Sequence, residues 1–136
     1  MSETIPADLR RMVIERAGGR CEYCLMHQDV SPYTHEIDHL IARKHGGQTV
    51  AENLALACLA CNRRKGSDMT TIDPVTNTVV PLFNPRVQRW PDHFVLQRAH
   101  IDGISPIGRG TVFLLALNLP DRLTRRESLL AEGLYP

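Results

Sequence analysis

Two pairs of cysteines constrain this chain more than any other feature of its sequence. Cys21 and Cys24 form one CxxC pair, Cys58 and Cys61 form a second, and 33 residues separate the two pairs. Four thiolates at this spacing can converge on one tetrahedral metal ion, and soft thiolate ligands select zinc. Such a site leaves no open coordination position. We therefore expect a structural zinc ion that pins both ends of the intervening loop.

Length and composition set the expected class of protein. At 136 residues, with 43% hydrophobic content, the chain has the size of one ordinary domain. Its N-terminus lacks the basic and apolar regions of a signal peptide, and no apolar run approaches the roughly 20 residues that span a bilayer. We expect a soluble cytoplasmic protein without membrane contact. In a reducing compartment the cysteines are better interpreted as metal ligands than as disulfides.

Basic residues gather around the second cysteine pair. The formal net charge of +1 does not by itself indicate a nucleic-acid-binding protein. The segment from His39 to Lys65, however, holds one acid, Glu52, against five bases, which suits contact with a phosphate backbone. The five bases are Arg43, Lys44, Arg63, Arg64 and Lys65. For Arg43 and Lys44, an ordinary solvated charged surface stays open as the alternative.

The N-terminal half predicts short elements around the cysteine pairs. Apolar spacing predicts a helix over residues 6–17, which Gly18 and Gly19 end. We expect a short strand over residues 34–38, a loop over 39–48, and a helix entered near Val50 or Ala51. A further helix begins at the second cysteine pair and ends at Gly66.

The C-terminal half, about residues 69–136, predicts mixed structure. Residues 79–83 resemble a strand interrupted by Pro81, which predicts an edge strand or a packed extended arm, and residues 94–97 and 100–104 suggest a hairpin. Ser105 and Pro106 predict the start of a helix, and Thr124 predicts a capping box before a last helix. One basic and aromatic cluster either lines a nucleic-acid cleft or packs onto the domain: Arg86, Arg89, Trp90, His93 and Phe94.

Several short motifs between and after the cysteine pairs occur together. They are Asp38-His39, Gly46-Gly47, Asn53-Leu54 and Cys61-Asn62-Arg63-Arg64-Lys65-Gly66. In this order they resemble the HNH endonuclease family, also called the ββα-metal nucleases, over roughly residues 20–67. The resemblance implies an α+β fold with a zinc-stapled ββα core at about residues 18–68. An N-terminal helix and a C-terminal extension of a short hairpin and two helices complete a single expected domain, residues 1–136.

The resemblance also implies roles for four residues. Asp38 and Asn62 correspond to ligands of a catalytic divalent ion, and His39 corresponds to the general base. Asn53 corresponds to the residue that fixes the loop and so orients His39. Asn62 stands where the family more often has histidine. A neutral oxygen ligand beside one carboxylate suits a hard cation such as Mg2+, and we expect Mg2+ or Mn2+.

The chemistry of these residues agrees with hydrolysis of a phosphodiester. A neutral imidazole can accept the proton of an attacking water, and a divalent ion can stabilise charge on the phosphate and the leaving oxygen. The resemblance implies cleavage of DNA with 5′-phosphate and 3′-hydroxyl products. One active centre per chain suggests nicking, and we expect a monomer or homodimer. Each residue also has a structural interpretation: Asp38 pairs with Arg43 or Lys44, His39 packs, and Asn53 caps a turn. The alternative function is an inactive zinc-ribbon module that binds nucleic acid.

Overall fold

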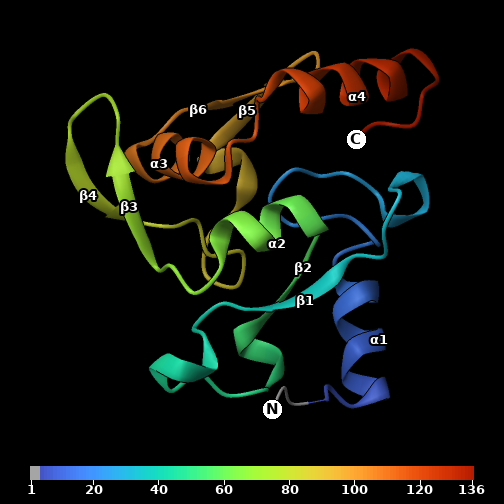
Figure 1. Cartoon of the computed structure of the whole chain (residues 1–136), viewed down its shortest axis with the longest axis vertical. Coiled ribbons are helices and arrows are strands. Elements are labelled where there is room, and N and C mark those ends of the chain that lie inside the picture. The colour runs from blue at the N-terminus through green and yellow to red at the C-terminus, as the bar shows by residue number, and fades with distance from the viewer. Residues whose placement is uncertain (1–3) are drawn as a thin grey trace.

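The computed structural model describes residues 4–136, so the first three residues of the N-terminal segment discussed above lie outside it. In Figure 1 the N-terminal half of the chain occupies the lower part of the molecule and the C-terminal half the upper part, with helix α2 (Leu59–Lys65) between them. The predicted N-terminal helix is α1 (Ala7–Arg16). Glycines follow it in the left-handed region, Gly18 at φ 63° and Gly19 at φ 73°.

The core of the lower half is a two-stranded antiparallel sheet followed by α2. Strand β1 (Glu36–His39) pairs with β2 (Leu54–Ala57), so that His39 lies opposite Leu54 and Glu36 opposite Ala57. The helix expected from Val50 or Ala51 is wrong, because only a 3-10 turn over Ala51–Asn53 precedes β2. All four residues of β2 are buried, and a continuous apolar segment does not distinguish a buried strand from a buried helix.

Side chains from three distant segments complete the outer edge of β2. The guanidinium group of Arg16 donates to the Leu54 carbonyl at 2.6 Å, and Arg86 donates to the same oxygen at 3.1 Å. Glu22 accepts from the Leu56 amide at 2.8 Å and forms an ion pair with Arg86. These contacts satisfy backbone groups that a sheet of two strands leaves unpaired.

The C-terminal half contains two hairpins rather than the single one expected. Strand β3 (Thr70–Asp73) pairs with β4 (Thr78–Pro81), and β5 (Phe94–Gln97) pairs with β6 (His100–Gly103). The second hairpin confirms the sequence prediction closely. The first was only partly predicted: its second strand ends at Pro81, which as expected lies on a sheet edge.

Two helices complete the C-terminal half. Helix α3 (Pro106–Leu115) begins as predicted, with the Ser105 hydroxyl accepting from the Gly108 amide at 2.9 Å. Helix α4 (Pro120–Ala131) begins at Pro120, so the capping box at Thr124 is wrong. Thr124 lies inside the helix, and its hydroxyl donates to the Pro120 carbonyl at 2.9 Å.

The main hydrophobic core joins the two halves around the cysteines. All four cysteines contact a buried cluster that includes Phe83, Phe94, Ile101 and Leu115 from the C-terminal half. The ring centroids of Trp90 and Phe94 lie 5.0 Å apart, and Trp90 Nε1 donates to the Tyr23 carbonyl at 2.9 Å. Of the two interpretations of the basic and aromatic cluster, packing is therefore the correct one for Trp90 and Phe94. None of the described helices is long and apolar enough to cross a membrane.

Candidate metal and nuclease site

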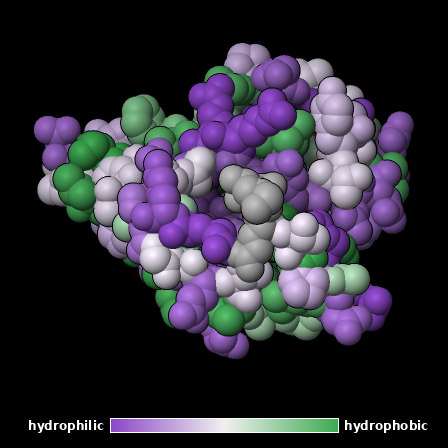
Figure 2. Space-filling view, turned by 60° about the horizontal axis from the view of Figure 1, so that its bottom comes forward, coloured by the Kyte–Doolittle hydropathy of each residue, from purple (hydrophilic) through white to green (hydrophobic). Residues whose placement is uncertain are grey.

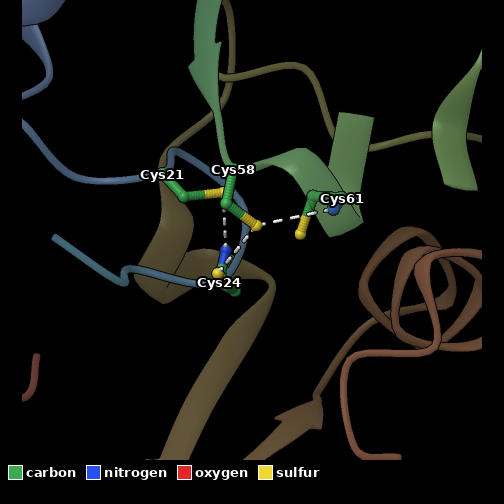
Figure 3. Close-up of side chains that lie close together, drawn as sticks. All are labelled: Cys21, Cys24, Cys58 and Cys61. Atoms are coloured by element: carbon green, nitrogen blue, oxygen red, sulfur yellow. Dashed lines mark hydrogen bonds between the residues drawn. The ribbon is translucent and has the colours of Figure 1, made fainter. Parts of the chain in front are cut away.

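The four cysteines lie together in an arrangement that fits one zinc ion. Cys21 and Cys24 come from the loop after α1, Cys58 follows β2, and Cys61 lies in the first turn of α2 (Figure 3). All four Sγ atoms lie within 4.8 Å of one another, and those of Cys24 and Cys58 are 3.7 Å apart. A tetrahedral site with Zn–S bonds of about 2.3 Å requires sulfurs about 3.8 Å apart.

Both cysteine pairs form the same backbone turn. In each pair the amide of the second cysteine donates to the sulfur of the first at 3.4 Å. Burial raises the pKa of Cys21 well above its ordinary value, whereas hydrogen bonds from neighbouring thiols lower the pKa of Cys24. Burial therefore disfavours four adjacent thiolates unless a cation lies among them, and a divalent metal ion offsets part of their charge.

Arg122 of α4 also contacts the cysteine cluster. Its Nη2 atom lies 3.0 Å from the Cys61 sulfur and 4.0 Å from the Cys58 sulfur. Its Nη1 atom donates to the carbonyls of Leu115 and Ala116, at the end of α3. The positive charge offsets part of the charge of the thiolates. The sequence offered no signal for this contact, because only tertiary packing brings residues 61 and 122 together.

Asp38 belongs to β1 and is buried against α2. Its carboxylate accepts hydrogen bonds from the Tyr23 hydroxyl at 2.8 Å and from the Lys65 ammonium group at 3.2 Å. Burial raises the pKa of Asp38, and Lys65 opposes that shift. The ion pair with Lys65 replaces the pairing with Arg43 or Lys44 that the sequence suggested. Because an ionised carboxylate has about four acceptor positions, Asp38 still has lone pairs to offer a hard cation.

Lys65 was predicted to contact phosphate, but in the structure it is buried. Its side chain is 2% exposed, and besides Asp38 it donates to the carbonyls of His39 at 3.3 Å and Leu40 at 3.5 Å. The three donors of the ammonium group are thus directed at the end of β1. In this conformation Lys65 cannot contact a phosphate. The physical reason is that it lies on the face of α2 that packs against β1.

His39 ends β1 and borders the loop that follows it. Its Nε2 atom lies 2.9 Å from the Thr49 hydroxyl, and the ring is half-buried. A hydrogen bond at one ring nitrogen fixes the orientation of an imidazole and defines which nitrogen is available as a base. Thr49 was not singled out from the sequence, and no motif marks it.

Asn53 holds the loop between β1 and β2 closed. Its Oδ1 accepts from the Ile41 amide at 2.9 Å, and its Nδ2 donates to the carbonyls of Ile41 at 3.0 Å and Gln48 at 2.9 Å. Gly47 is essential to this closure, because a Cβ atom there would lie 1.7 Å from the Ile41 carbonyl oxygen. Thr49, which contacts His39, belongs to the same loop.

Asn62, like Lys65, lies on the side of α2 that faces β1, but it contacts a different residue of that strand. Its Nδ2 donates to Glu36 Oε1 at 2.8 Å. Glu36 and Asp38 lie on one face of β1, because side chains alternate along a strand. Among the described residues no contact joins Asn62 to Asp38. Glu36 is thus the carboxylate of β1 that faces Asn62, and the sequence had indicated no role for it.

The other predicted cations lie on the surface. Arg43, Lys44, Arg63 and Arg64 are exposed. Figure 2 shows the end of the molecule near the β1–β2 loop turned forward, and hydrophilic side chains gather on this face.

Comparisons with known proteins agree with this geometry. A short antiparallel pair followed by a helix, with four cysteines beside it, is the arrangement expected of a ββα-metal nuclease core. Residues 21–68 match the family model of the HNH endonucleases, which confirms the resemblance and identifies this segment as an HNH endonuclease domain. An HNH domain implies a nucleic-acid substrate.

The chain is also similar to the Septu protein PtuB of Bacillus thuringiensis, with 26% identity over 117 residues. The match covers 85% of this chain and 43% of that protein, so the chain spans less than half the length of this relative. No solved structure matches the chain significantly.

Proposed function

We propose that the chain is a metal-dependent DNA endonuclease that nicks its substrate by hydrolysing a phosphodiester bond. The observation that carries this proposal is the placement of His39. The imidazole is held by Thr49 in a loop that Asn53 closes, directly after the buried carboxylate of Asp38. This is more order than a nucleic-acid-binding module requires, because such a module has no use for an oriented base.

His39 is proposed as the general base. It takes a proton from a water molecule, whose oxygen attacks the phosphorus atom while the bond from phosphorus to the 3′ oxygen breaks. The leaving oxygen takes a proton from solvent water, and His39 later returns its own proton to solvent, so the products are a 3′-hydroxyl and a 5′-phosphate. In the tautomer whose Nε2–H donates a hydrogen bond to the Thr49 hydroxyl, Nδ1 carries no proton and can act as the base.

Asp38 and Asn62 are the proposed ligands of the catalytic Mg2+ or Mn2+ ion. A carboxylate and an amide oxygen are hard donors, which suits either ion. When bound, the ion acts as a Lewis acid that stabilises charge on the phosphate and leaving oxygens. The ammonium group of Lys65 donates to Asp38 at 3.2 Å and so holds this carboxylate in place on β1.

Exposed arginines and lysines are the proposed phosphate contacts. Arg63 and Arg64 follow Asn62 on α2, and Arg43 and Lys44 lie in the loop that His39 borders. Contacts of this type position a duplex without reading its bases, so affinity falls as salt rises.

Nicking of supercoiled plasmid tests the proposal directly. Zinc-loaded protein is expected to convert the plasmid to open circles when Mg2+ or Mn2+ is added, and not when both are omitted. DNA ligase is expected to seal the nicks, because ligation requires a 5′-phosphate beside a 3′-hydroxyl. Protein that binds the plasmid but leaves it supercoiled at every Mg2+ and Mn2+ concentration would instead support the inactive zinc-ribbon module.

A further inference from the structure

Glu36 lies close to the proposed ion site without a role assigned to it so far. It is half-buried on the same face of β1 as Asp38. Its Oε1 atom accepts a hydrogen bond from Asn62 Nδ2 at 2.8 Å. This contact links the strand that carries Asp38 to the helix that carries Asn62.

The chemistry of a carboxylate determines which side of the Asn62 amide faces Glu36. A carboxylate accepts hydrogen bonds but cannot donate them, whereas the asparagine amide has one accepting and one donating side. The NH2 group of Asn62 must therefore face Glu36, and Oδ1 must point away from it. Asn62 Oδ1 accepts no hydrogen bond within residues 4–136, so it is available to a ligand.

We propose that Glu36 is a positioning residue that presents Asn62 Oδ1 to the divalent ion. The inference rests on the proposed function, because it assumes that Asn62 is an ion ligand. An amide turned by 180° would direct two N–H donors at the cation and remove a ligand. Glu36 excludes that rotamer by hydrogen bonding, so it raises affinity for the ion without contacting it.

The affinity of zinc-loaded protein for Mn2+, followed by electron paramagnetic resonance, tests this inference without an activity assay. Glu36→Ala is expected to weaken Mn2+ binding about 10- to 100-fold, as for other residues that orient metal ligands. Glu36→Gln retains an acceptor oxygen that can face Nδ2, so it is expected to recover most of the affinity. Glu52→Gln, which removes an exposed negative charge from the loop between β1 and β2, is the control for general electrostatics.

A change at Asn62 separates positioning from direct ligation by Glu36. Asn62→Asp carries two equivalent oxygens, so one oxygen faces the ion in either rotamer. In the Asn62→Asp background, Glu36→Ala is therefore expected to cause no further loss of Mn2+ affinity. Zinc content and melting temperature, measured on each variant, show that the fold is retained.

Three results would overturn the inference. Wild-type affinity in Glu36→Ala would show that Glu36 does not act on the ion site. Equal losses in Glu36→Gln and Glu36→Ala, or a further loss in the Asn62→Asp background, would show that Glu36 binds the ion itself. None of these results contradicts the proposed nuclease activity, provided that the wild-type protein binds Mn2+ and nicks DNA. A wild type that neither binds Mn2+ nor nicks DNA would overturn both.

Discussion

The cysteine cluster and the loop around His39 are neighbouring regions held by different kinds of interaction. The cluster consists of four buried sulfurs that converge from two separate segments, and one ion fits among them. The loop is held by three hydrogen bonds of the Asn53 side chain, Thr49 contacts His39, and Lys65 secures the strand before the loop. The first arrangement is closed, whereas the second leaves an oriented, half-buried imidazole at the end of β1. In the proposed nuclease, this difference separates folding from chemistry within fewer than fifty residues.

Loss of one cysteine is expected to have the largest effect. Cys58→Ser removes a ligand at the junction of β2 and α2, and structural zinc contributes about 10–16 kcal/mol to folding in zinc-finger peptides. The variant is expected to lose zinc and its cooperative melting transition, measured by metal analysis and calorimetry. Full zinc content with unchanged melting would show that Cys58 is not a ligand.

Lys65→Met is expected to have the next largest effect, through the buried charge of Asp38. Removing one partner of a buried ion pair costs about 3–5 kcal/mol, because the remaining charge is left unpaired. The free energy of unfolding, measured with denaturant, should fall by that amount while zinc is retained. Lys44→Met is the control, since Lys44 is exposed and should change stability little. Equal stability of the two variants would contradict the burial of Lys65.

Asn53→Ala is expected to have the smallest effect on stability and to act on the loop alone. Three hydrogen bonds are lost, and their unpaired backbone groups cost about 1–3 kcal/mol. Hydrogen exchange is expected to increase over residues 40–49 and to stay unchanged around the cysteines. Asn53→Asp keeps the acceptor for the Ile41 amide, so it should loosen the loop less. Increased exchange at both regions in Asn53→Ala would show that they are not independent.

The sequence predicted the parts of this structure that depend on local or covalent constraints. The spacing of Cys21, Cys24, Cys58 and Cys61 predicted their convergence, and Ser105 predicted the start of α3. The missed features depend on tertiary contacts. Strand β2 was assigned wrongly because Leu-Ala-Leu-Ala suits a helix as well as a buried strand, and pairing with β1 decides between them.

The site was predicted to a similar extent. The motif order drew attention to Asp38, His39, Asn53 and Asn62, whose roles stay predictions. The motif order could not indicate which neighbouring residue each of these side chains would contact. Lys65 was misassigned because a basic run on a short helix does not show which member turns inward, and α2 turns Lys65 toward β1. Thr49, Glu36 and Arg122 have no sequence signal at all, since each acts through a partner brought near by folding.

His39→Ala tests the separation of folding from chemistry most directly. The imidazole makes no contact with the cysteine cluster among the described residues, so the variant is expected to keep its zinc content and melting temperature. Loss of a general base typically costs about 100- to 10,000-fold in rate. Plasmid nicking in Mg2+ is therefore expected to fall by at least 100-fold at matched zinc content. Nicking as fast as that of the wild type, in a variant with matched zinc and melting temperature, would contradict the account.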